Sequence, residues 1–132
     1  LVALRKELDL ENEVIFLHEI EEQMKAALIK KCDLFLMPSI IYKKSIEGFG
    51  ISFIEAACYS KGSIGGNCGG EKDAIHDGLT GYICDGTELG SIYDSVIKFF
   101  NGDNYLKIGK NALKFSHQFS WKKIIKKYLN LI

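Results

Sequence analysis

Short apolar runs alternate with amphipathic stretches along the 132 residues of the chain. The apolar runs at 14–17 and 34–37 have the length of buried strands, and we expect further short strands at 63–65 and 81–84. Helical spacing predicts helices at 21–31, 50–59, 71–76, 88–100, 105–115 and 121–132. Strands that alternate with helices are typical of an α/β fold with a parallel sheet flanked by helices.

Three of the expected helices show an apolar stripe. In the first two the stripe predicts the buried face, whereas we expect the stripe of the last helix to be exposed and to favour self-association. The stripes consist of Met24, Ala27 and Leu28; of Ile51, Ile54 and Cys58; and of Trp121, Ile124, Ile125, Tyr128 and Ile132. The last helix carries four lysines on its other face, Lys122, Lys123, Lys126 and Lys127. We expect a solvated face there rather than docking at a membrane.

The first residues already look like the middle of a helix, because Leu1, Leu4 and Leu8 repeat at helical spacing with no capping residue before them. We therefore expect the chain to be a fragment of a longer protein, with one domain over residues 1–132. Its length is enough to bury a core without disulfides or metals.

Composition excludes several classes of protein. The 17 Lys and Arg residues balance the 17 Asp and Glu residues, which argues against nucleic acid as a partner. No apolar run reaches the length of about 20 residues that spans a bilayer. The spacing of Cys32, Cys58, Cys68 and Cys84 contains no Cys-x-x-Cys pair. Cys32, Cys58 and Cys84 lie in apolar runs and are expected as reduced core residues in a cytoplasmic protein, although a disulfide stays open.

The stretch from Glu47 to Glu55 has the strongest chemical pattern. It follows a strand and a loop, contains Gly48 and Gly50, and leads into a helix. Ligands of open parallel sheets bind beyond the carboxyl ends of the strands, where helix N-termini favour anions. This arrangement would accept a diphosphate without a metal, and the two carboxylates could face one cleft and bind ribose or sugar hydroxyls. Spacing alone makes this a weak signal, because most such glycines are turns.

A second glycine-rich loop, residues 65–70, also follows a strand and precedes a helix. Two such loops at neighbouring strand ends would form the two walls of a phosphate site. Cys68 lies between the glycines and is the cysteine expected to be exposed, but no histidine is placed beside it, so a nucleophilic cysteine is disfavoured. No Asp-x-Asp occurs in a loop, so a metal-held diphosphate is not indicated.

The order of the motifs resembles the C-terminal half of a family 4 glycosyltransferase (group 1) with the GT-B fold. The matching segments are VIFL (14–17), CDLFLMPS (32–39), EGFGISFIEAA (47–57), GGNCGG (65–70), HDGLTGY (76–82) and FSWKKI (119–124). The resemblance implies a Rossmann-like sheet and a retaining, metal-independent transfer of sugar from a nucleotide-sugar donor. No cofactor is implied. It also implies a separate N-terminal acceptor-binding domain, here missing together with the first strand-loop unit of this domain.

The resemblance also implies a role for each matching residue. Glu47 would be the catalytic residue that contacts the donor sugar. Phe49, Gly50 and Ile51 would offer backbone N–H groups to sugar and phosphate, with Ser52 nearby and Gly69 and Gly70 on the other wall. Glu55 would hold the ribose hydroxyls, and Ile20 and Glu22 would lie near the base. The longer protein would act in surface polysaccharide or glycolipid synthesis and could contact a membrane peripherally.

Some departures from the family pattern keep other hypotheses open. His18 replaces a glycine, and Gly69-Gly70-Glu71-Lys72-Asp73 lacks a proline and has a shorter acid. The phosphate-clamping Arg and Lys of the family would precede Leu1, so the fragment alone is expected to be inactive. The alternative is a non-catalytic or split-enzyme partner module that binds a nucleotide-sugar or a second chain. A sugar-nucleotide epimerase fits less well, because it does not need the Glu-Gly-Phe-Gly spacing.

Overall fold

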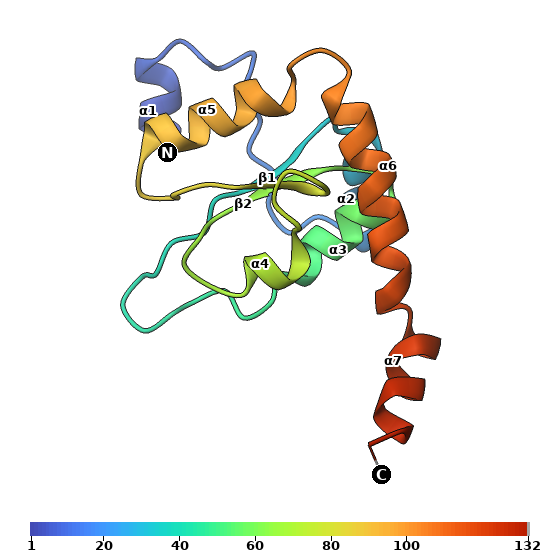
Figure 1. The fold of residues 1–132 in the computed structure, drawn as a ribbon. Coiled ribbons are helices and arrows are strands. Elements are labelled where there is room, and N and C mark those ends of the chain that lie inside the picture. The colour runs from blue at the N-terminus through green and yellow to red at the C-terminus, as the bar shows by residue number, and fades with distance from the viewer. Residues whose placement is uncertain (132) are drawn as a thin grey trace.

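The computed structural model describes residues 1–131 and contains one parallel sheet of three strands in the order β1-β2-β3. The strands are β1 (Phe35–Met37), β2 (Ser63–Gly65) and β3 (Gly81–Ile83). Helix α3 (Ile51–Cys58) connects β1 to β2, and the short helix α4 (Glu71–Ala74) lies between β2 and β3. The predicted α/β class is thus confirmed, and all three strands end at the same edge of the sheet (Figure 1).

The remaining helices agree with the expected positions to within a few residues. They are α1 (Val2–Glu7), α2 (Glu22–Lys31), α5 (Leu89–Phe99), α6 (Asn104–Ser116) and α7 (Trp121–Leu129). The 3₁₀ turn η1 (His117–Phe119) is an additional short turn that the sequence did not predict. Pro38, which directly follows β1, has no N–H to continue the ladder. Residue 132, the last residue of the predicted apolar stripe, lies outside the described residues.

Side chains of the strands alternate between two apolar clusters, as the pleat of a strand requires. One cluster contains Ile64, Tyr82, Cys84, Phe99 and Ile108, and so joins the sheet to α5 and α6. The other contains Phe53, Ile54, Ala74 and Ile75, and joins it to α3 and α4. The sheet is thereby covered by helices, and the loops at its carboxyl edge are held on a packed base.

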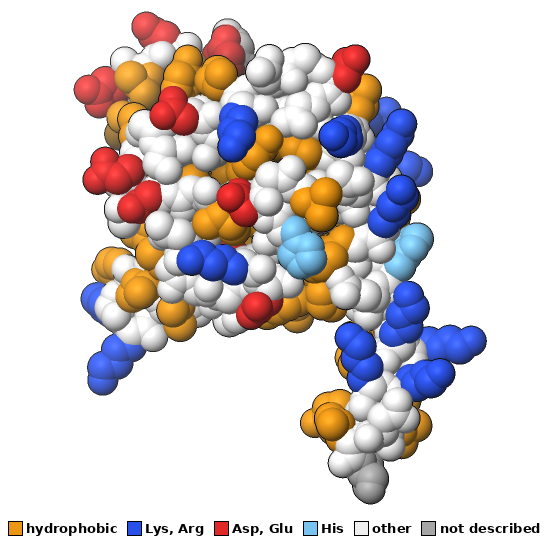
Figure 2. Space-filling model, viewed as in Figure 1, with side chains coloured by type: hydrophobic (Ala, Val, Ile, Leu, Met, Phe, Trp, Pro, Cys, Tyr) orange, Lys and Arg blue, Asp and Glu red, His pale blue; other side chains and the backbone are white. Residues whose placement is uncertain are grey.

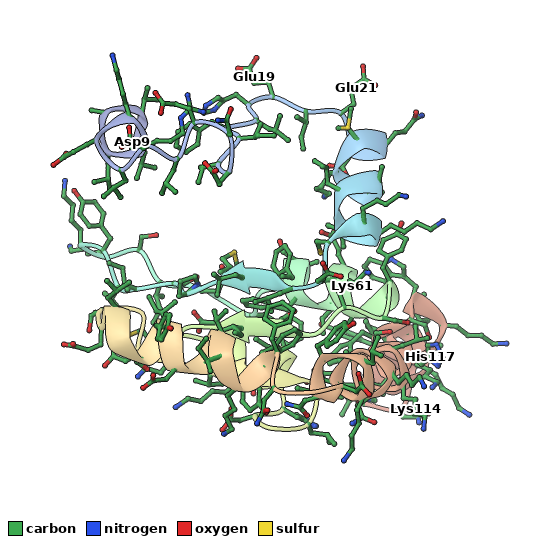
Figure 3. All side chains as sticks on the ribbon, turned by 90° about the horizontal axis from the view of Figure 1, so that it is seen from above. Asp9, Glu19, Glu21, Lys61, Lys114 and His117 are labelled. Carbon is green, nitrogen blue, oxygen red and sulfur yellow. The ribbon has the colours of Figure 1, made fainter. Side chains whose placement is uncertain are left out.

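The predicted strand at 14–17 is wrong. The segment has no regular structure, and the side chains of Ile15 and Leu17 are 75% and 51% exposed. Its contacts are with α1, because the Arg5 guanidinium donates to the Val14 carbonyl at 2.9 Å and lies over the Phe16 ring. An apolar run becomes a strand only where a neighbour supplies hydrogen bonds, and the arm of residues 1–21 runs apart from β1 (Figure 3).

The predicted buried face is wrong for α2 and partly wrong for α3, where Ile54 is buried as expected. Helix α2 buries Ile29 and leaves Met24 and Leu28 54% and 41% exposed, because the side of α2 that faces α3 is the one with Ile29. Helix α3 buries Phe53, Ile54, Ala56 and Ala57, whereas Ile51 and Cys58 are exposed. All four cysteines are free thiols, and Cys58, rather than the half-buried Cys68, is the exposed one.

Helix α7 extends beyond the body of the molecule, joined to it through η1 (Figure 1). Its apolar side chains are exposed, with Trp121, Ile125 and Tyr128 at 78%, 52% and 71%. Lysines lie beside this apolar surface on the projecting part (Figure 2). Within residues 1–131, no helix combines the length and the apolar character needed to cross a membrane.

Candidate functional site

Three loops meet at the carboxyl edge of the sheet, following β1, β2 and β3 in turn. The Gly70 N–H donates to the Glu47 carbonyl at 2.9 Å, which joins the second loop to the first. A Cβ on Gly70 would overlap the Gly48 carbonyl oxygen, and a Cβ on Gly69 would overlap that of Glu47. The two glycine-rich loops therefore lie in direct backbone contact, as their positions after neighbouring strands predicted.

The third loop, 84–88, was not singled out in the sequence. Its Gly86 packs on the first loop, where an added Cβ would lie 2.6 Å from the Pro38 carbonyl oxygen. Asp85 accepts hydrogen bonds from the Thr87 hydroxyl at 2.6 Å and from the Thr87 N–H at 2.9 Å. These bonds, that of the hydroxyl first, hold the pKa of Asp85 below its usual range. The Asp-Gly-Thr turn signal was the available clue.

The first loop ends in a helix N-terminus with unused donors. Gly50 has φ +85°, a left-handed conformation, and forms the N-cap of α3. The backbone N–H groups of Gly50, Ile51 and Ser52 donate to no other group among residues 1–131. Phe49 is half-buried and packs on Phe119 of η1, with ring centroids 5.5 Å apart. The η1 turn, near the carboxyl end of the chain, thus packs against this loop.

The structure does not bring the two candidate carboxylates into one hollow. Glu47 is half-buried and lines a cavity of about 280 Å³ together with Ser39, Ile40, Ser45 and Ile46. Glu55 lies further along α3 and lines a groove of about 290 Å³ between α2 and α3. Glu47 and Glu55 thus line two separate hollows of the structure and not a shared one.

Glu22 lies with Glu55 in the groove between α2 and α3. Ile20, the other residue expected there, is 39% exposed and precedes α2. Lys25, which the sequence did not single out, joins the two acids: its Nζ lies 2.9 Å from Glu22 Oε2 and 3.4 Å from Glu55 Oε2. The hydrogen bond to Glu22 is the main cause that raises the pKa of Lys25.

Glu71 is the second residue that the sequence did not single out. It begins α4 directly after Gly70, is fully buried, and has no hydrogen-bond partner for either carboxylate oxygen within the described residues. A Cβ on Gly69 would lie 2.9 Å from its Oε2. A buried acid at the base of the second loop could not be read from the sequence, where a charge after two glycines is typical of a solvated turn.

Among residues 1–131, no group of three or more His, Cys, Asp or Glu side chains is placed to hold a metal ion. The groups available at the site are therefore the oriented backbone amides at the N-terminus of α3, the candidate acids Glu47 and Glu55, and Lys25. This set suits an anionic ligand that also carries hydroxyl groups.

Comparison with known proteins gives a consistent result. The family described as Glycosyl transferases group 1 matches residues 1–115. An alpha-1,3/1,6-mannosyltransferase from Dictyostelium discoideum is 35% identical over 120 residues, which is 89% of this chain and 27% of that protein. A D-inositol 3-phosphate glycosyltransferase from Mycobacterium tuberculosis is 28% identical over 124 residues, 92% of this chain and 25% of that protein. The chain thus spans about a quarter of the length of these curated relatives.

Solved structures share the fold. Sucrose-phosphate synthase from Thermosynechococcus elongatus superposes with a TM-score of 0.84 at 20% identity, over 98% of this chain and 32% of that one. Anabaena HepE, solved in complex with UDP and glucose, superposes with a TM-score of 0.78 at 20% identity, over 99% of this chain and 35% of that one.

Proposed function

The chain belongs to the group 1 glycosyltransferases, and on that premise we propose that it is the donor-binding, C-terminal half of a family 4 enzyme. The full protein would transfer a sugar from a nucleotide-sugar with retention of configuration and without a metal. A separate acceptor-binding domain would complete it, and surface polysaccharide or glycolipid synthesis is the proposed pathway class. Residues 1–132 would form one nucleotide-sugar-binding domain.

The observation that carries the proposal is the helix N-terminus at Gly50. Its free N–H groups lie on a loop that the backbone of Gly69 and Gly70 holds from the other side. An anion placed there would receive several hydrogen bonds from groups that are already oriented, together with the favourable end of the helix dipole. A departing nucleoside diphosphate is the anion that such preorganised donors stabilise best during sugar transfer.

The proposed roles of the acids are those that the family resemblance implies for the matching residues. Glu47 precedes the N–H groups of α3 and would contact the sugar hydroxyls, with Phe49, Gly50, Ile51 and Ser52 at the sugar and phosphate. Glu55 would accept hydrogen bonds from the ribose, because an ionised carboxylate acts only as an acceptor. Ile20 and Glu22, at the start of α2, would lie near the base. A neighbour solved with UDP and glucose supports this class of ligand for the fold.

We expect the chain to bind one of UDP, GDP or ADP in isothermal titration calorimetry, with the same affinity in magnesium and in EDTA. Glu55→Gln should lower the affinity for that nucleotide about tenfold or more, because a hydrogen bond to a charged group is lost. Glu47→Ala should leave nucleotide affinity unchanged and remove only the additional affinity of the nucleotide-sugar over the nucleotide.

One control variant and the outcomes that contradict the proposal complete the experiment. Asp94→Asn changes an exposed acid on α5, away from the three loops, and should bind as the unmodified chain does. Equal nucleotide binding by Glu55→Gln would contradict the ribose assignment, and binding that requires magnesium would contradict metal independence. A longer protein that binds the nucleotide-sugar but transfers nothing would favour the non-catalytic partner module.

A further inference from the structure

The ion pairs in residues 1–131 meet at a single ammonium group, that of Lys25. Its Nζ contacts Glu22 Oε2 at 2.9 Å, and reaches Oε2 and Oε1 of Glu55 at 3.4 and 3.5 Å. Glu22 and Lys25 are one helical turn apart on α2, whereas Glu55 comes from α3. Lys25 is therefore the side chain that joins the two walls of the groove at the acid proposed for the ribose.

The geometry restrains the Glu55 carboxylate. Its side chain is 41% exposed, so without a partner it would exchange between rotamers on the surface of α3. An ammonium near both oxygens restrains the carboxylate plane and still leaves lone pairs on each oxygen for further donors. The shorter contact with Glu22, at 2.9 Å, restrains Lys25 in turn.

Charge balance points in the same direction. A nucleoside diphosphate is an anion, and Glu22 and Glu55 would repel it if they stood alone. Lys25 offsets this repulsion at the point where the acids must accept hydroxyl groups. A positive charge that both neutralises and orients an acceptor serves recognition better than an acid free in solvent.

We propose that Lys25 is a positioning residue for donor recognition, whose ammonium holds the Glu55 carboxylate in the orientation that accepts the ribose hydroxyls of a nucleoside diphosphate. This inference rests on the proposed function. Lys25 acts through Glu55, and its removal should change the discrimination between ribose and dideoxyribose rather than abolish nucleotide binding.

The test measures dissociation constants for UDP, GDP or ADP, whichever binds most tightly, and for its 2′,3′-dideoxy counterpart. The unmodified chain should prefer the ribonucleotide about tenfold or more. Lys25→Met should reduce that preference about threefold, in line with the strength of partly exposed ion pairs, and Lys25→Arg should restore most of it. Lys30→Met is the matched control, because Lys30 is an exposed lysine of the same helix, and it should keep the full preference.

Each other outcome has a definite meaning. If Lys25→Met lowers the affinity for both nucleotides by the same factor, or changes neither affinity, the preference for ribose is unchanged and the positioning role is overturned. If the unmodified chain binds none of the three nucleotides, or binds without preference for ribose, the proposed function fails before any variant is compared, and this inference fails with it.

Discussion

Glu71 shows how strongly a single residue can depart from what its type favours. Both of its carboxylate oxygens are buried, and neither has a hydrogen-bond partner in the described residues. Its neighbours include Gly65, Gly69 and the apolar cluster that contains Phe53 and Ile75. Burial of a polar group without a partner costs roughly 1–3 kcal/mol in proteins, and more when the group is charged.

We expect Glu71→Leu to raise the free energy of unfolding by about 1–3 kcal/mol, because an apolar side chain of similar volume needs no partner at this position. Urea unfolding followed by circular dichroism measures the change. Asp73→Leu is the control, since Asp73 is an exposed acid of the same short helix and gains little from an apolar side chain. A lower stability of Glu71→Leu would mean that the carboxyl group has a partner in solution.

At the scale of elements, the site depends on loops that fit against one another through their backbones. Gly66 and Gly86 approach the backbone of Ser39, and Gly70 approaches that of Gly48. Such contacts leave no room for a Cβ, so only glycine fits at Gly66, Gly70 and Gly86 without displacing a neighbouring loop. This close approach of the loops explains why these three glycines follow the strands.

Gly70→Ala should destabilise the chain by about 1–3 kcal/mol, because its Cβ would overlap the Gly48 carbonyl oxygen and push the two loops apart. Gly90→Ala is the matched control: Gly90 lies in α5 with nothing within 4 Å of an added Cβ. Alanine should stabilise that helix by about 0.5–1 kcal/mol. Thermal unfolding compares the two, and equal melting temperatures would count against the interlocked loops.

At the scale of the whole molecule, apolar surface remains exposed at several places, among them the outer edge of the sheet and the last helix. The outer edge of β1 pairs with no strand in residues 1–131, and Leu36 is 45% exposed there. Helix α7 projects from the body with Trp121, Ile125 and Tyr128 exposed (Figure 2). Unpaired strand edges and contiguous apolar surface both favour association with another chain or segment.

We expect the chain to self-associate, with a weight-average mass that rises with concentration in sedimentation equilibrium. The double substitution Trp121→Ser and Ile125→Ser should reduce this association, because it removes the largest apolar groups of α7. Leu106→Ser is the control, since Leu106 is a similarly exposed apolar residue on α6. A monodisperse monomer at high concentration would contradict the prediction.

Local sequence patterns were sufficient for most of the elements. The segments predicted as strands at 34–37, 63–65 and 81–84 contain β1, β2 and β3. The glycine loops met as expected, because parallel strands end at one edge of the sheet. The run at 14–17 has the same local pattern, yet it is no strand, because pairing needs a neighbour that no local pattern specifies.

The sequence by itself determined the class of fold, the order of its elements and the placement of the glycine loops, because these follow from periodicity and turn chemistry along the chain. Only the tertiary structure decided which face of α2 and α3 is buried, that Glu71 lies in the interior, and that Lys25 joins Glu22 to Glu55. A helix can turn any side toward a partner, so burial and ion pairs depend on segments distant in sequence, whose packing no local pattern encodes.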